Sequence, residues 1–186
     1  MMNTLQDFSI IKLVVDKYFD LLEEKGGNFY MSEFIPEVML DRSKEYDEGY
    51  SYWLPVKSTV SEKDVIDMEV FLGHPLPESF IFFLRQRHFM ELQLGSHAIN
   101  FFSILPGEVL SKFKEIIEML YWNLLERNYL PFAHVSDWGV LCFDANLKSP
   151  TNDYSVIILD HEDGYNKPTF YARSFKDMFN EFNALD

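Results

Sequence analysis

The chain has 186 residues, of which 47% are hydrophobic and 17% aromatic, and its formal net charge is −14. This composition excludes a disordered or low-complexity chain, because so much apolar surface can offset the entropy lost on folding, and the length suits one domain with a sizeable core. The acidic balance, without any cluster of Lys and Arg, argues against direct binding to nucleic acid. No stretch approaches the roughly 20 apolar residues that a membrane helix needs, and the first residues lack the features of a signal peptide, so we expect a cytoplasmic protein that does not bind membranes.

The N-terminal part, residues 1–57, is predicted to form a helix and an irregular extension that packs on the core. The helix is expected from Leu5 to Glu24, and Gly26 should end it because glycine reaches left-handed conformations without a steric penalty. The apolar residues near helical spacing are Ile10, Leu13, Val14, Phe19 and Leu22. From Met31 to Tyr52 charged and aromatic residues follow no clear period, which predicts a loop or short helices at the domain edge.

Two helices are expected to meet at the corner "GHPLP". Ser61 and Asp64 have the spacing of a capping box at the start of the first helix, and Gly73 should stop that helix. Pro77 suits the first turn of the second helix, since proline has no amide proton to leave unpaired. We expect Glu69, near the end of the first helix, to accept hydrogen bonds from the backbone of the corner rather than to mark a site. The predicted core faces consist of Val65, Met68, Phe71, Leu72, Phe80, Phe83 and Leu84.

The rest of the chain alternates strands with helices. A possible strand pair at "HFMEL" and "AINFFSIL" precedes a long helix from about Gly107 to Asn128. Four short β-rich runs follow, "YLPFAHV", "WGVLCFD", "YSVIILDH" and "TFYA", and a last helix is capped by Ser174. The long helix should direct Val109, Phe113, Ile116, Leu120 and Leu124 to one side, and the last helix should bury Phe175, Met178, Phe179 and Phe182. This order predicts a single α+β domain with a mainly antiparallel sheet packed against helices.

Several landmarks in this order resemble the SUKH superfamily, which groups yeast cell-wall-synthesis regulators with bacterial immunity proteins. The match covers roughly residues 58–182, and it leads us to describe residues 58–186 as a SUKH-like domain. In two places the chain departs from the pattern: many members have an Asn-Gly turn where this chain has residues 85–89, "RQRHF", and residues 1–57 lie outside it. The matching landmarks are Val60 to Val65, Glu69, Gly73, Leu76-Pro77, Ser79-Phe80, Phe83-Leu84, Leu130 to Ala133, Trp138-Gly139, Cys142 to Asp144, Asp160 to Glu162 and Ser174-Phe175.

The resemblance implies a protein-binding module that is not an enzyme and needs no cofactor. Many bacterial members are encoded beside a polymorphic toxin, often a nuclease, and protect the producing cell by binding the toxin domain. We therefore expect an immunity protein that neutralises a cognate, basic, nuclease-like toxin domain by occluding it. The alternative that the resemblance leaves open is a regulatory adaptor that binds a host protein through the same surface.

Polar residues gather around the strands "WGVLCFD" and "YSVIILDH", and they admit two chemical interpretations. Asp137, Asp144, Asp160 and His161, with His134 nearby, could bind a divalent ion in a metal-dependent enzyme. The simpler interpretation is that the aspartates make turns at strand ends by accepting hydrogen bonds from nearby backbone amides. No motif of a metalloprotease, calcium-binding loop or nucleotide site accompanies them, so we predict no metal ligands.

Cys142 and Trp138 are predicted to have different roles. Cys142, the single cysteine, stands between Leu141 and Phe143 in an apolar run, which predicts a buried core residue rather than a catalytic thiol. Trp138 begins a strand after a loop and could anchor a partner, although it could also be a half-buried residue at the rim of the sheet. The predicted partner-binding residues are Asp137, Trp138, Asp144, Glu162, Asp163 and Tyr165.

Overall fold

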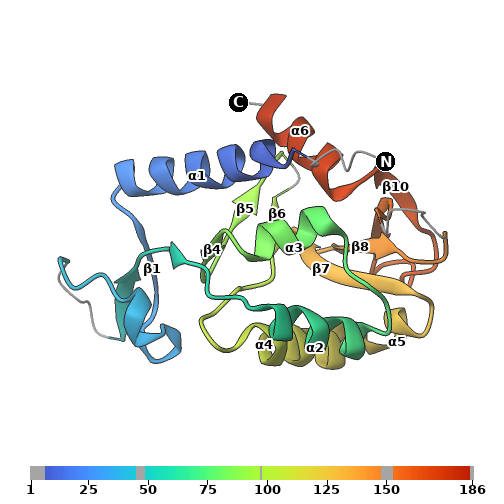
Figure 1. Cartoon of the computed structure of the whole chain (residues 1–186), viewed down its shortest axis with the longest axis horizontal. Helices are drawn as coiled ribbons and strands as arrows, with labels where there is room; N and C mark the ends of the chain where they lie inside the picture. The colour runs from blue at the N-terminus through green and yellow to red at the C-terminus, as the bar shows by residue number, and fades with distance from the viewer. Residues whose placement is uncertain (1–6, 45–48, 97, 148–152, 185–186) are drawn as a thin grey trace.

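A six-stranded antiparallel sheet forms the centre of the protein, in the order β10-β9-β8-β7-β6-β5 (Figure 1). The structure is a computed structural model and describes residues 7–44, 49–96, 98–147 and 153–184. Its elements are α1 (Ser9–Glu24), β1 (Asn28–Met31), the 3-10 helices η1 (Ser32–Phe34) and η2 (Glu37–Met39), β2 (Tyr50–Trp53), β3 (Val56–Lys57), α2 (Glu62–Leu72), α3 (Glu78–Leu84), β4 (Arg87–His88), β5 (Gln93–Leu94), β6 (Ile99–Phe101), α4 (Val109–Ile116), the π-helix η3 (Ile117–Tyr121), α5 (Trp122–Leu125), β7 (Tyr129–Val135), β8 (Gly139–Asp144), β9 (Val156–Asp160), β10 (Thr169–Ala172) and α6 (Phe175–Ala184). This arrangement confirms the predicted fold class, a single α+β domain with a mainly antiparallel sheet.

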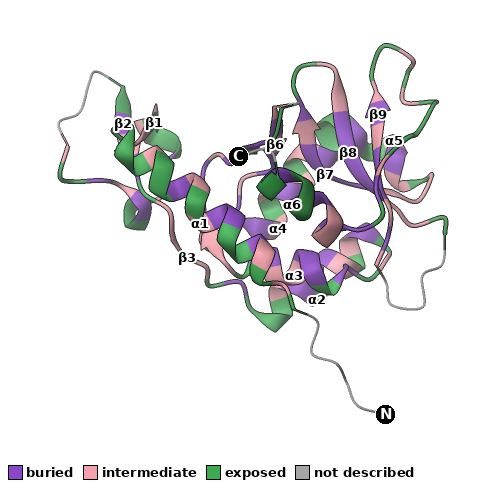
Figure 2. Ribbon diagram, turned by 90° about the horizontal axis from the view of Figure 1, so that it is seen from above, coloured by how far each residue is buried: buried purple, intermediate pink, exposed green. Residues whose placement is uncertain are grey.

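Aromatic rings form the main core, between one face of the sheet and helices α3 and α6. Phe132 and Phe143 stack at 4.3 Å, and Phe80 of α3 meets the ring of Phe175 of α6 at 5.1 Å. On the opposite face, Tyr121 of η3 packs against His134 of β7. A register shift between Pro131 and Ala133 of β7 turns His134 to the face opposite Phe132. The sheet is covered on both sides, as the buried stripes of β7 and β8 in Figure 2 illustrate.

The corner between α2 and α3 has the structure that the local sequence predicted. Ser61 and Asp64 make a reciprocal capping box, and Gly73 adopts a left-handed conformation at φ 73° that ends α2. Pro77 occupies the N-cap of α3, one residue before the helical turn. A carboxylate oxygen of Glu69 accepts a hydrogen bond from the backbone N–H of Leu76 at 2.8 Å, which confirms its structural role in the corner.

The N-terminal helix starts later than predicted and buries a different set of side chains. It begins at Ser9, after Asp7 and Phe8, while Leu5 lies outside the described residues. Its buried side chains are Ile11, Val14, Val15 and Phe19. Leu13, predicted to face the core, is 55% exposed, because α1 presents a narrow stripe to α6 and α3 rather than a broad apolar face.

The irregular segment from Met31 to Tyr52 contains the two expected short helices, but also part of a strand pair that the sequence did not predict. β1 pairs antiparallel with β2, and aromatic residues occupy both faces of the ribbon, so no apolar-polar alternation marks it in the sequence. Residues 45–48 lie outside the described part of the chain.

The long helix is also interrupted. A π-turn at η3 inserts between α4 and α5, and the inward positions shift from Ile116 and Leu120 to Ile117 and Tyr121. The prediction that Leu120 faces inward was therefore wrong, because a π-turn holds more residues than an α-turn and moves later side chains around the helix.

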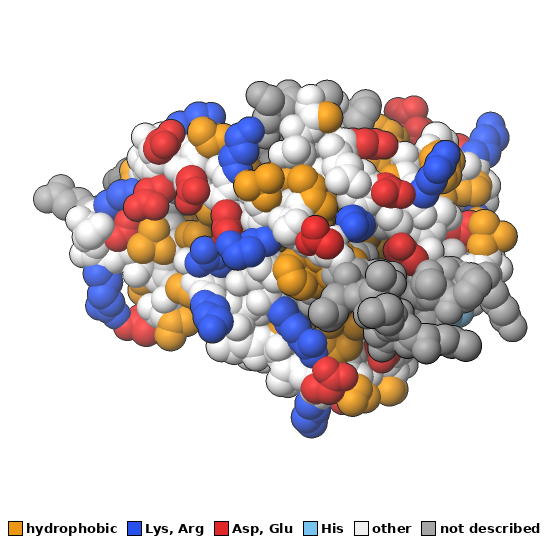
Figure 3. All heavy atoms as spheres, turned by 45° about the horizontal axis from the view of Figure 1, so that its top comes forward, with side chains coloured by type: hydrophobic (Ala, Val, Ile, Leu, Met, Phe, Trp, Pro, Cys, Tyr) orange, Lys and Arg blue, Asp and Glu red, His pale blue; other side chains and the backbone are white. Residues whose placement is uncertain are grey.

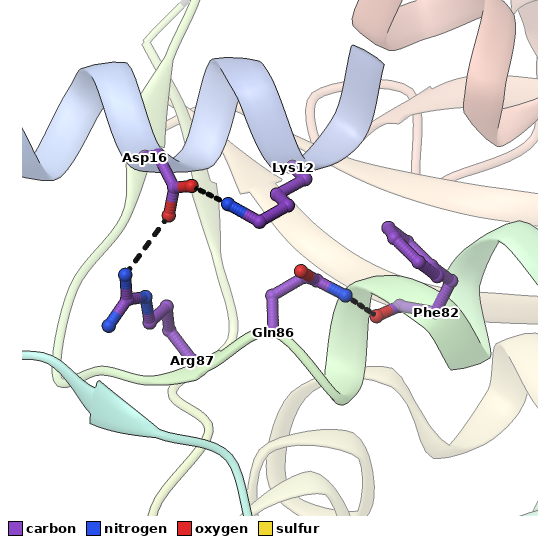
Figure 4. Close-up of polar contacts among 5 residues, drawn as sticks. All are labelled: Lys12, Asp16, Phe82, Gln86 and Arg87. Atoms are coloured by element: carbon purple, nitrogen blue, oxygen red, sulfur yellow. Dashed lines mark hydrogen bonds and ion pairs between the residues drawn. The ribbon is translucent and has the colours of Figure 1, made fainter. Parts of the chain in front are cut away.

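The two segments that depart from the SUKH pattern, residues 85–89 and residues 1–57, contact each other in the structure. β4 pairs with β3 of the extension, and Arg87 donates a hydrogen bond to Asp16 of α1 at 3.2 Å, while Lys12 also pairs with Asp16 (Figure 4). Partial burial alone would raise the pKa of Asp16, but the hydrogen bonds from Lys12 and Arg87 hold that pKa below its ordinary value. Residues 85–89 therefore form part of the surface on which the N-terminal helix packs.

Candidate functional site

The β7–β8 turn and the β9–β10 loop meet at one end of the sheet. Gly139 lies opposite Asp160 in the ladder between β8 and β9. Beyond this pair, the carbonyl oxygen of Trp138 accepts a hydrogen bond from the backbone N–H of His161 at 2.9 Å. The same oxygen lies 2.7 Å from Nδ1 of the His161 ring. The structure therefore brings Asp137 and Trp138 beside the loop that carries Glu162 and Asp163. We call this end of the sheet the loop end, formed by residues 136–138 and 161–165.

Two acids in or next to the loop end make turns, as predicted. Asp160 Oδ1 accepts from the N–H of Glu162 at 2.8 Å, and Asp163 Oδ1 accepts from the N–H of Asn166 at 2.9 Å. Asp137 and Glu162 are exposed, and neither carboxylate holds a backbone amide within the described chain. These two charges are therefore available to a partner without disturbing the turns.

Asp144 does not belong to this group. It ends β8 opposite Tyr129, five residues from Gly139, which places it about 17 Å along the strand from the loop end. Its Oδ1 accepts from the N–H of Asn146 at 3.0 Å, so it makes the turn predicted for a strand end. The separation follows from strand geometry, because Gly139 and Asp144 are at opposite ends of β8.

Tyr165 links the loop end to the helical layer. Its ring meets the ring of Tyr121 edge-on at 5.9 Å, and its carbonyl oxygen accepts from Arg127 Nη1 at 2.7 Å. Burial raises the pKa of the Tyr165 hydroxyl. The residue is half-buried with φ 63°, so its main contribution is to hold the loop against η3.

The histidines and acids do not form the metal site that the sequence left open. Asp144 lies far from Asp137, Asp160 and His161, and His134 Nδ1 is 2.8 Å from the hydroxyl of Tyr121. Burial lowers the pKa of His134. Within the described ranges, no three or more His, Cys, Asp or Glu side chains are grouped so as to hold a metal ion.

Cys142 lies in the core, as predicted. It is 0% exposed, and burial raises the pKa of its thiol well above the ordinary value. Because the thiolate is the nucleophilic form, this environment suits a packed side chain rather than a reactive one.

The structure reveals an exposed apolar segment that the sequence did not indicate. Met119, Leu120 and Trp122 are 68%, 46% and 57% exposed, and they flank the buried Tyr121 in η3 and α5. Trp138, the tryptophan favoured from the sequence, is half-buried, and Trp53 is buried, so Trp122 is the tryptophan that faces solvent. Since Tyr121 contacts Tyr165, this segment adjoins the loop end. The π-turn exposes Leu120, and no residue pattern in the sequence identified that turn.

The helical face formed by α1 and α6 differs in character from the loop end. Figure 3 shows acidic and basic side chains interspersed over the face that α1 and α6 form. Several of these charges are paired within the chain, as Lys12 is with Asp16. This face does not concentrate the net negative charge.

Comparison with known proteins identifies one family. The model of the SMI1 / KNR4 family (SUKH-1) matches residues 59–181, which is more than half of the chain and spans α2 to α6. No curated protein matches the sequence significantly. In the described part of the chain, no helix is both long and apolar enough to cross a membrane.

Proposed function

Because the chain belongs to the SMI1 / KNR4 family (SUKH-1), we propose that it is a cytoplasmic, non-enzymatic binding module that acts as an immunity protein. It neutralises a cognate polymorphic toxin domain of the nuclease class by covering the toxin's active surface. One molecule acts on one toxin domain, and no cofactor takes part.

The observation that carries this proposal is the loop end. Asp137 and Glu162 present exposed carboxylates there, beside the half-buried Trp138 and close to the exposed segment that contains Trp122. Loops fixed on a rigid sheet commonly carry binding residues, and tryptophans are enriched among the residues that dominate binding energy. A basic substrate groove of a nuclease has the complementary charge.

Electrostatic attraction sets the rate of encounter in this mechanism. The net charge of −14 steers a basic partner towards the protein, and the aromatic side chains then determine how long the complex lasts. Asp144 is left out of the contact set, because it lies at the other end of β8.

The first experiment is co-purification with the product of the adjacent gene, followed by rescue of cells from that product's toxicity. We expect a stable complex whose association slows steeply between about 20 and 200 mM salt, because salt screens exposed charges. A partner from the host in place of a toxin would support the regulatory adaptor. Association that is indifferent to salt would contradict the electrostatic mechanism.

Charge reversal tests whether the loop end is the contact surface. The double variant Asp137→Lys, Glu162→Lys should slow association by at least about tenfold at low salt. A matched control, Asp20→Lys with Glu181→Lys, makes the same change in net charge on the face of α1 and α6 and should have a much smaller effect. If both variants slow association equally, net charge alone acts and the loop end is not the contact surface.

Trp122→Ala provides the apolar test. It should raise the dissociation rate while the melting temperature stays nearly constant, because the side chain is 57% exposed. Unchanged dissociation would remove the π-helix segment from the contact set.

A further inference from the structure

The N-terminal unit, residues 28–54, exposes an unusual number of apolar side chains. Six of the fifteen large hydrophobic residues found exposed in the described chain lie in this unit: Phe29, Met31, Phe34, Val38, Tyr50 and Leu54. Their exposed fractions range from 37% to 67%. Concentrated apolar surface of this kind marks contact sites for other molecules. The unit also lies outside residues 59–181, which match the family model.

A cleft of about 340 Å³ lies where this unit meets the family domain. Tyr30 and Phe34 form its aromatic wall on one side, with their rings in edge contact at 6.5 Å. Met90 and Leu105 contribute apolar surface from the other side. The cleft exists only because the extension docks onto the domain, since neither part supplies both walls.

The charged groups of the cleft are mostly acidic. Glu33, Glu108 and Glu115 line it together with a single cation, Lys112, so three carboxylates face one ammonium group and two negative charges remain. Lys112 Nζ donates to Glu115 at 2.9 Å. This hydrogen bond, together with the nearby Glu108, raises the pKa of Lys112 although burial acts the other way. The cleft therefore already stabilises one cation and has carboxylates left for another.

We propose that this cleft binds a basic side chain, an arginine or a lysine, from a segment of a protein partner. The aliphatic stem of such a side chain packs against Phe34 and Tyr30, and its cationic end lies over the rings and meets Glu33 and Glu108. Phe34, one of the exposed apolar residues of the N-terminal unit, lies in the cleft itself and contacts the incoming segment. A second copy of this acidic chain is a poorer occupant, because its net charge of −14 would repel it.

This proposal does not depend on the immunity role, and its test needs no toxin. The probe is an acetylated, amidated Gly-Arg-Gly peptide, compared with the same peptide carrying citrulline, which has nearly the same shape without the charge. Backbone amide shifts of the ¹⁵N-labelled protein are followed during titration. We expect saturable shifts confined to the amides around Glu33, Phe34, Ser103 and Lys112 with the arginine peptide, and none with the citrulline peptide.

The variant Glu33→Gln, Glu108→Gln should weaken binding by at least about fivefold, because two charge-assisted contacts become neutral. Both residues are exposed, and the Glu108 side chain makes no cap hydrogen bond at α4, so folding should be unaffected. A matched control, Asp20→Asn with Glu181→Gln, makes the same charge change on α1 and α6 and should keep the wild-type affinity. Shifts spread over the acidic surface, equal binding of the citrulline peptide, or equal loss in both variants would overturn the proposal.

Discussion

At the scale of single residues, the buried side chain of His88 is held by specific hydrogen-bond partners. His88 is 1% exposed, and its Nε2 lies 2.8 Å from the backbone nitrogen of Thr59. Its Nδ1 lies 3.1 Å from the carbonyl oxygen of Ile104. Because Nε2 accepts the Thr59 N–H while Nδ1 donates, the ring fits its site in the neutral form.

This arrangement predicts how stability responds to pH. Burial lowers the pKa of His88 below its ordinary value of 6.5, so the unfolded chain binds a proton at a pH where the folded protein does not. The contribution to stability is complete above the unfolded pKa and is lost as pH falls through 6.5 towards the lower folded value. His134, whose pKa burial also lowers, has the same sign.

Urea denaturation at pH 7.5 and pH 5.5 checks this prediction. The wild type should be less stable at the lower pH, and His88→Gln should reduce that difference by up to about 1.4 kcal/mol, because pH 5.5 lies one unit below the ordinary pKa of histidine. His161→Gln, on an exposed histidine, should keep the wild-type difference. An unchanged difference in His88→Gln would mean that the pKa of His88 is the same in the folded and unfolded states.

At the scale of elements, the π-turn decides which side chains of one helical segment are buried. A regular helix would direct Leu120 inward, but η3 directs Tyr121 inward and leaves Leu120 46% exposed. The same turn places the Tyr121 hydroxyl 2.8 Å from His134. One local irregularity therefore creates the buried polar pair and adds Leu120 to the exposed segment beside the loop end.

Alanine substitutions at Tyr121 and Leu120 distinguish the π-turn from a regular α-helix. Tyr121→Ala should lower the free energy of unfolding by about 3–5 kcal/mol, as large aromatic truncations in cores do. Leu120→Ala should cost less than about 0.5 kcal/mol, because changes at exposed positions usually have small effects. Chemical denaturation measures both, and a larger cost at Leu120 would indicate a regular α-helix.

At the scale of the whole molecule, the N-terminal helix is part of the folded core. The ring of Phe19 contacts both Trp53 of the extension and Phe89 of the family domain, at 6.2 Å and 6.1 Å. Phe8 meets Phe82 of α3 at 5.5 Å. Apolar contacts that cross between the two parts favour one cooperative unit.

Phe19→Ala tests that cooperativity. We expect the whole protein to unfold in a single transition with a free energy lowered by about 3–5 kcal/mol. Leu13→Ala on the same helix is the matched control and should have little effect, because Leu13 is 55% exposed. Two separate transitions, or a core transition that Phe19→Ala leaves unchanged, would mean that residues 1–57 fold independently.

Local signals in the sequence predicted much of the fold and part of the candidate site. The capping box at Ser61, the left-handed Gly73 and the apolar strands appeared as expected, because each depends on chemistry within a few residues. The turn-making role of Asp144 and Asp160 was predicted for the same reason. The burial of Cys142 followed from its apolar neighbours.

The sequence by itself thus determined the α+β class, the family and the chemistry of the strand ends, since these follow from periodicity and short-range hydrogen bonding. Only the tertiary structure decided that Asp144 lies away from Asp137, that Trp122 rather than Trp138 faces solvent, and that the extension completes an acidic cleft. Each of these depends on strand direction, on one π-turn or on contacts between segments far apart in the chain, which no local pattern of residues encodes.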